Sequence, residues 1–182
     1  MRYAGFWSRF GAGIVDLLVL TPIIGLSIWS FTESRMTALL LVAPLNFFFA
    51  AYNIYFVGRW GQTVGKMALK IKVVALDGTE AGFYRALLRH SVDLGYSIIS
   101  TALIIFVLAS ITSTEYDPLS FIDKSVLQAE RTPSWGIIIE NLYLAWVASE
   151  LLVLLLNKKR RALHDFIAGT VVVHVDAAPA PV

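Results

Sequence analysis

Long apolar stretches dominate the pattern of hydrophobic and polar positions along this chain. Four of them approach the roughly 20 residues that an α-helix needs to cross a bilayer. They cover residues about 10–31, 37–57, 92–111 and 136–156. Because few charged residues interrupt them, the pattern predicts an all-α membrane protein built as a bundle of four transmembrane helices.

Two shorter segments have the alternating pattern of β-strands. Residues 70–75 (KIKVVA) alternate polar and apolar side chains, and Asp77-Gly78 then supplies a turn. Residues 170–175 (TVVVHV) form a second run rich in β-branched residues. We expect these two runs to pair into a small sheet on the cytosolic side of the membrane.

Two further helices are expected in the connections between spans. Residues 82–89 read as a basic helix that leads into the third span. Asp117 followed by Pro118 suggests a helix cap and a first-turn proline. Apolar residues recur at helical spacing after that proline, so the sequence predicts an amphipathic helix over 118–131 on the outer surface.

The composition supports the membrane interpretation. Of the 182 residues, 57% are hydrophobic and only 15% are charged, and the mean hydropathy is +0.69. Soluble domains contain about 25% charged residues, so a soluble globular protein and a nucleic-acid-binding protein are both excluded. The chain contains no cysteine, which rules out disulfide bonds, thiolate zinc sites and cysteine nucleophiles.

The basic residues predict the orientation. Placing the N-terminus, residues 58–91 and the C-terminus in the cytosol puts 12 of the 15 basic residues there. Cytoplasmic loops are enriched in Lys and Arg, so both termini should be cytosolic. The basic N-terminus resembles a signal peptide, but its apolar run is too long and contains an aspartate, so we interpret it as a retained first span. The sequence predicts a single domain over residues 1–176 and a disordered tail over residues 177–182.

Ionisable residues at membrane depth are the main candidates for function, because each is costly in lipid. Asp16 in the first span, Asp93 at the start of the third and Glu150 in the fourth all fall in the inner part of the bilayer. If these acids face one another, they form a cation or proton site. The alternative is a structural ion pair, in which Arg9 or Arg89 neutralises Asp16 or Asp93.

Glu150 and the neighbouring residues His164 and Asp165 are candidates for proton transfer. Glu150 has no basic residue one helical turn away, which favours a proton-exchanging role for it. His164 lies beside Asp165 in the segment that follows the fourth span. A histidine next to a carboxylate can relay protons, but the same pair can simply cap a short helix. Both interpretations stay open.

Enzymatic and cofactor functions have no motif behind them. Residues 61–66 (GQTVGK) superficially resemble a phosphate-binding loop, but Trp60 stands where the first glycine is needed and Met67 replaces the magnesium ligand. The histidines have no metal-ligand spacing. We therefore expect no catalytic residues, no cofactor, no metal and no enzyme activity.

Five blocks of sequence together resemble the RDD family of bacterial membrane proteins. These blocks are Tyr3–Asp16, Gly61–Val74, Asp77-Gly78, Arg85–Arg89 and Arg160–Val172. The family is named for one arginine and two aspartates. Arg9 and Asp16 match the first two, and Asp165 matches the third, with Asp93 as the alternative. The resemblance implies an integral membrane protein suspected of transport, with an unknown ligand.

Two functions from different classes follow. The first is a transporter of the bacterial inner membrane that exchanges monovalent cations for protons through buried carboxylates. The second is a non-transporting scaffold or regulatory subunit of a partner complex. Four spans are few for a carrier, so we expect a homo-oligomer or a partner membrane protein. The bilayer itself is the remaining expected partner.

Overall fold

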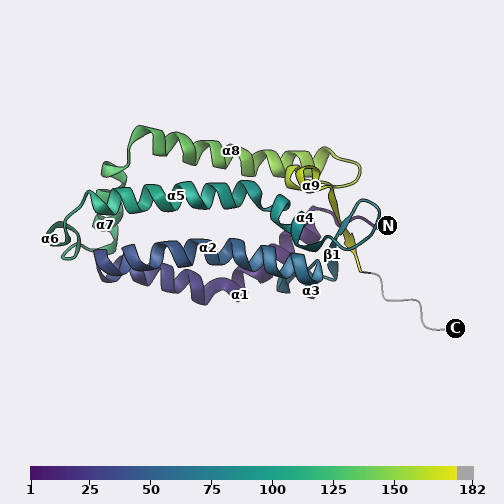
Figure 1. Ribbon diagram of the computed structural model, residues 1–182, viewed down its shortest axis with the longest axis horizontal. Coiled ribbons are helices and arrows are strands. Elements are labelled where there is room, and N and C mark those ends of the chain that lie inside the picture. Colours follow the sequence, from purple (N-terminus) through teal and green to yellow (C-terminus); the bar gives the residue numbers. More distant parts are fainter. Residues whose placement is uncertain (176–182) are drawn as a thin grey trace. The chain divides into compact units, whose positions relative to one another are not determined.

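The computed structural model describes residues 1–175, and within them the chain forms nine helices and two strands (Figure 1). The long helices are α1 (Phe6–Glu33), α2 (Arg35–Trp60), α5 (Ser91–Ala109) and α8 (Ser134–Leu156). The shorter elements are α3 (Val64–Ala68), β1 (Ile71–Ala75), α4 (Gly82–Arg89), α6 (Ser113–Tyr116), α7 (Phe121–Arg131), α9 (Leu163–Ala168) and β2 (Thr170–His174). The tail predicted at residues 177–182 lies outside the described residues.

The four long helices coincide with the four predicted apolar stretches. Each is long and apolar enough to cross a membrane. Most ends extend beyond the apolar stretches: α1 begins at Phe6 and α2 continues to Trp60. The reason is that backbone hydrogen bonds of a helix continue into the polar interface, where apolar side chains are no longer required.

The chain divides into two compact units. The first comprises residues 1–19, 51–91 and the described residues from 147 onward; the second comprises residues 20–50 and 92–146. The long helices α1, α2 and α8 each contribute residues to both units. The candidate residues therefore fall into two groups, which are described separately.

The first unit is organised around the predicted sheet, which the structure confirms. β1 pairs antiparallel with β2, from Ile71 opposite His174 to Ala75 opposite Thr170. One face of this pair packs on an apolar core to which α1, α2 and α4 contribute. The buried residues of this core are Ala4, Ala12, Val57, Ile71, Val73, Ala81, Ala86 and Val172. Two strands alone are marginally stable, so this packing holds the sheet in place.

The second unit contains a separate apolar core between α1, α2, α5 and the connection from α5 to α8. Its buried members are Ala38, Leu103, Val107, Leu108, Ile111 and Tyr116. Polar side chains add specific contacts inside it: Asn46 Nδ2 of α2 donates to Thr101 Oγ1 of α5 over 3.0 Å. Such a bond between spans is worth about 0.6–2 kcal/mol.

The connection from α5 to α8 differs from its predicted form. The amphipathic helix begins at Phe121, and its N-cap is Ser120 rather than Asp117. Asp117 instead accepts a hydrogen bond from the backbone N–H of Arg35, at the first residue of α2 (2.8 Å). The side chain of Lys124 is buried and donates to the carbonyl of Thr32 near the end of α1. This connection therefore satisfies backbone groups that the ends of α1 and α2 leave free.

Candidate functional site

Helix α9 brings Asp165 into the interior of the first unit. Asp165 lies in the first turn, where its own carboxylate accepts the backbone N–H of Ala162 over 3.1 Å. The helix ends at Gly169, whose φ of 63° is in the left-handed region that favours glycine. These two terminal signals fix a helix of only six residues, and β2 then starts at Thr170.

The side chain of Asp165 is the centre of a buried charged cluster, which we define as Arg9, Arg89, Asp165 and Thr170. Arg9 Nη1 donates to Asp165 Oδ2 over 2.7 Å. Arg89 Nη1 donates to the other oxygen, Oδ1, which also accepts the Thr170 hydroxyl over 3.0 Å. Asp165 and Thr170 are fully buried, and the side chain of Arg89 is 6% exposed. The cluster joins α1, α4, α9 and β2.

The cluster contains two guanidinium groups and one carboxylate, and the two positive charges keep that carboxylate ionised. Burial by itself would raise the pKa of Asp165, but the guanidinium groups of Arg89 and Arg9 outweigh it and hold the pKa well below its usual range. Asp165 therefore carries its negative charge throughout the physiological pH range. The cluster therefore joins these helices and β2 through an ionised carboxylate.

The ion pair expected between Arg9 and Asp16 is not formed. The two residues are seven apart on α1, but the guanidinium of Arg9 binds Asp165 and also donates to the carbonyls of Arg160 and Ala4. Arg89 likewise binds Asp165 rather than Asp16 or Asp93. A shared helix face brings two residues near each other, whereas a carboxylate on a different element can meet both arginines with better geometry.

Asp16 has its own set of neutral partners in the first unit. Its Oδ1 accepts the hydroxyl of Tyr52 over 2.8 Å and the backbone N–H of Gly65 over 2.7 Å. Its Oδ2 accepts the hydroxyl of Thr63 over 2.6 Å. The Tyr52 oxygen accepts in turn the backbone N–H of Val64. These three donors occupy both carboxylate oxygens, so Asp16 fastens the start of α3 to α1 and α2.

The glycines of the GQTVGK segment explain why this arrangement is possible. Gly61 has a φ of 70°, and turns the chain sharply after α2. A Cβ on Gly65 would lie only 2.0 Å from the carbonyl oxygen of Ala12. The backbone of α3 can approach α1 this closely only because position 65 carries no side chain. Gly61 therefore makes the tight turn after α2, and Gly65 has a packing role.

Lys66 follows directly on this close contact. Its Nζ donates to the hydroxyl of Thr63 over 3.3 Å. Burial, and then the positive charge of Arg89, lower the pKa of Lys66 to about 8, while Asp16 acts in the opposite direction. Its charge therefore responds to mildly alkaline pH, unlike that of an ordinary surface lysine.

Glu150 and His164 form a separate pair in the same unit. Glu150 accepts the backbone N–H of His164 through Oε1 over 2.8 Å, and contacts the imidazole Nδ1 through Oε2. Burial and the charge of Arg89 lower the pKa of His164, against the opposing effect of Glu150. His164 is therefore neutral near pH 7, with Nδ1–H donating to Glu150. The side chains of Glu150 and His164 are 16% and 23% exposed, whereas that of Asp165 is fully buried.

Asp93 belongs to the second unit. It lies in the first turn of α5, and its Oδ1 accepts the hydroxyl of Tyr143 of α8 over 3.1 Å. The ring of Tyr143 stacks on Tyr96, with 3.7 Å between the centroids. Asp93 thus joins α5 to α8 within the second unit.

Sequence reasoning missed several partners of these acids. Tyr52 and Thr63 hold Asp16, and Thr170 holds Asp165. A tyrosine within an apolar span is the one available signal for Tyr52, and the N-cap position before α3 is the signal for Thr63. Within residues 1–175 there is also no group of three or more His, Asp or Glu side chains placed to hold a metal ion.

Comparison with known proteins gives one match. The model of the RDD family matches residues 3–169, and so includes Arg9, Asp16, Asp93 and Asp165. No curated protein and no solved structure matches the chain. The matched range ends at Gly169, the residue that terminates the helix carrying Asp165.

Proposed function

Because this chain belongs to the RDD family of membrane proteins, we propose that it is a multi-pass protein of the bacterial cell membrane that exchanges a monovalent cation for a proton. The proton-binding group in this proposal is Glu150, with His164 as its partner. No catalytic step, cofactor or resident metal is required.

The Glu150–His164 pair is the observation that supports this proposal. Glu150 contacts the imidazole Nδ1 of His164 directly, whereas Asp165 is bound by two arginines and Asp16 by hydroxyl and amide donors. A neutral imidazole leaves the pair with one negative charge. Binding one proton cancels that charge, and binding Na⁺ or K⁺ cancels it equally. Competition between the two ions for one charge is the minimum chemistry of an exchanger.

Replacing Glu150 with glutamine tests this directly. The amide keeps the size of the side chain and its hydrogen-bonding capacity but removes the titration. We expect the variant to reach normal abundance and to lose Na⁺- or K⁺-dependent proton movement in proteoliposomes that contain a pH-sensitive dye.

The matched control is Glu33→Gln, because Glu33 is an exposed carboxylate at the end of α1. It should retain full proton movement. If the wild-type protein moves no protons in response to either cation between about pH 6 and 9, the exchanger proposal is wrong.

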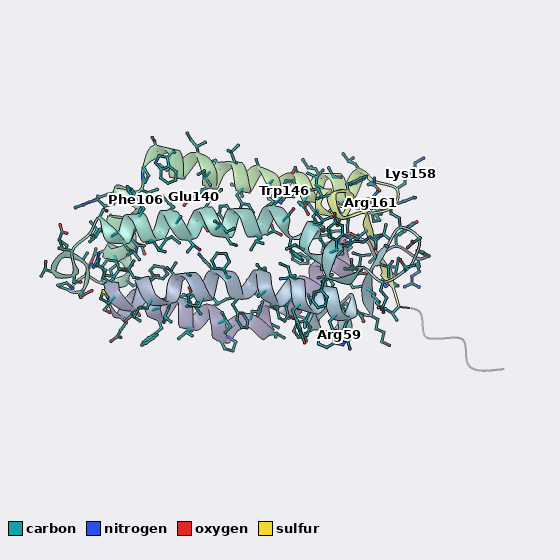
Figure 2. The ribbon with its side chains drawn as sticks, viewed as in Figure 1. Arg59, Phe106, Glu140, Trp146, Lys158 and Arg161 are labelled. Atoms are coloured by element: carbon teal, nitrogen blue, oxygen red, sulfur yellow. The ribbon has the colours of Figure 1, made fainter. Side chains whose placement is uncertain are left out.

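The proposal also includes an orientation, with both termini and the α2–α5 connection in the cytosol. Figure 2 shows the basic residues Arg59, Lys158 and Arg161 near the ends of α2 and α8 in the first unit, and cytosolic ends of spans are rich in such residues. The chain has no native cysteine, so a single introduced cysteine is the only thiol that a maleimide can label. We expect Lys159→Cys to react with a membrane-impermeant maleimide only after the cells are opened, and Glu130→Cys to react in intact cells. Reaction of both in intact cells would contradict the orientation.

A second candidate function is a scaffold or regulatory subunit that moves nothing. The observation that favours it is the charged cluster, in which Arg9, Arg89 and Asp165 satisfy one another inside the protein. Basic residues nearby remain exposed for an acidic partner, namely Arg59, Lys70, Lys158, Lys159 and Arg160. If the protein purifies with a stoichiometric partner and shows no cation-dependent proton movement in proteoliposomes, the scaffold function is supported over the exchanger.

A further inference from the structure

A cavity of about 310 Å³ lies between α5, the end of α7 and α8 in the second unit. Its volume is at the lower limit of ligand-binding pockets, which suits a small molecule. Part of its wall is apolar, and the residues that supply this part include Leu103, Ile104, Val107 and Ile137. Three polar residues complete the lining: Gln128, Thr132 and Glu140.

Glu140 is the charged member of this lining. It lies six residues into α8, or about 9 Å along the helix, whereas Trp135 stands at the interfacial end of the same helix. Figure 2 labels Glu140 between the ribbons of α8 and α5, and both helices supply residues to the cavity lining. Among residues 1–175 its carboxylate accepts no hydrogen bond and forms no ion pair. A carboxylate at this depth is costly unless a proton or a cation neutralises it.

The other two polar residues have already used their hydrogen-bond donors. Gln128 Nε2 donates to the hydroxyl of Tyr116 and to the carbonyl of Lys124, each over 3.3 Å. The Thr132 hydroxyl donates to the carbonyl of Gln128 over 2.8 Å. What these side chains can still offer a ligand is acceptor oxygen, from the Gln128 amide and the Thr132 hydroxyl. The polar lining of the cavity is therefore acceptor-only and carries one negative charge.

We propose that this cavity binds a small amphiphilic ammonium ion. Its N–H groups donate to Glu140 and to the acceptor oxygens of Gln128 and Thr132, and its hydrocarbon part packs against the apolar wall. A bare alkali cation would leave that wall unfilled, and a neutral alcohol would leave the Glu140 charge uncompensated. The site does not depend on Glu150 or on cation/proton exchange.

Isothermal titration of the purified full-length protein in detergent with hexylammonium chloride tests the proposal, with 1-hexanol as the neutral ligand of matching length. We expect saturable binding of hexylammonium and none of hexanol. Because a hydrogen bond to a charged group contributes about 1.5–3 kcal/mol, Glu140→Gln should weaken binding at least about tenfold. Glu130→Gln changes an exposed carboxylate outside the cavity lining, and should bind as the wild type does.

A second variant keeps the test decisive if Glu140→Gln does not fold. Ala129→Leu adds apolar volume at the cavity wall without changing any charge, and should also abolish binding. Glu150→Gln should bind hexylammonium normally, which separates this site from the proposed exchanger. Equal binding of hexanol and hexylammonium, or wild-type affinity in both Glu140→Gln and Ala129→Leu, would overturn the proposal.

Discussion

Asp165→Asn is expected to destabilise the protein by about 3–5 kcal/mol and to reduce its abundance in the membrane severely. The substitution removes the one carboxylate that neutralises Arg9 and Arg89 inside the charged cluster. Both guanidinium groups would then remain buried without a counter-charge, and the ion pairs that link α9 to α1 and α4 would be lost. Thermal unfolding in detergent, followed by tryptophan fluorescence, measures the effect.

The matched control is Asp77→Asn in the first unit. Asp77 is exposed and accepts hydrogen bonds from Thr79 in a turn, which an asparagine oxygen can also accept. It should leave the melting temperature close to that of the wild-type protein, as surface substitutions usually do. Adding Arg9→Gln to Asp165→Asn removes one of the uncompensated charges, so the double variant should be more stable than Asp165→Asn alone. Equal stability of Asp165→Asn and Asp77→Asn would show that the cluster does not hold the unit together.

The cluster also predicts a direction for acid sensitivity. The pKa of Asp165 is lower in the folded protein than in the unfolded chain. Its stabilising contribution is therefore complete above the unfolded value of about 3.9, and is lost as the pH falls further below that value. Wild-type stability should decline in this acidic range, and the decline should be smaller in Asp165→Asn, which has no carboxylate to protonate at this position.

Gly65→Ala is the second substitution with a large expected effect. Its Cβ would lie 2.0 Å from the carbonyl oxygen of Ala12 and 2.8 Å from Cγ of Asp16. Because both neighbours are held in α1, α3 must move away, and the hydrogen bond from Gly65 N to Asp16 lengthens or breaks. Overpacking costs about 1–3 kcal/mol, and a lost hydrogen bond to a charged group about 1.5–3 kcal/mol more. The decrease of the melting temperature in detergent measures the combined loss of stability from overpacking and from the broken hydrogen bond.

Gly13→Ala is the control for this substitution. Gly13 is also in α1, one residue after Ala12, but a Cβ there would meet nothing within 4 Å. Alanine is the better helix former by about 1 kcal/mol, so Gly13→Ala should be neutral or stabilising. If Gly65→Ala melts at the same temperature as Gly13→Ala, the close contact between α3 and α1 is not required for the fold.

The sequence by itself determined that this is a helical membrane protein, and where most of its helices and strands lie. Four apolar stretches of spanning length, two alternating runs and the turn at Asp77-Gly78 led to four long helices and a two-stranded sheet, as the structure has them. Such patterns are local: they depend on helical or strand period and on the transfer of side chains into lipid. The predicted start of the amphipathic helix, at residue 118, was wrong. Asp117 accepts a hydrogen bond from the distant N–H of Arg35 instead of capping the helix, and a local capping rule cannot include such a partner.

Only the tertiary structure decided how the charged residues pair. Arg9 and Asp16 lie on one helix at a favourable spacing, yet Arg9 binds Asp165, 156 positions away in the chain. Glu150 has no basic neighbour in its own helix, yet it meets His164 of α9. Helical spacing limits which side chains on one element are close, whereas a buried charge takes whichever partner the packing of other elements brings to it. That choice depends on contacts across the whole fold, and the pattern along the chain does not contain it.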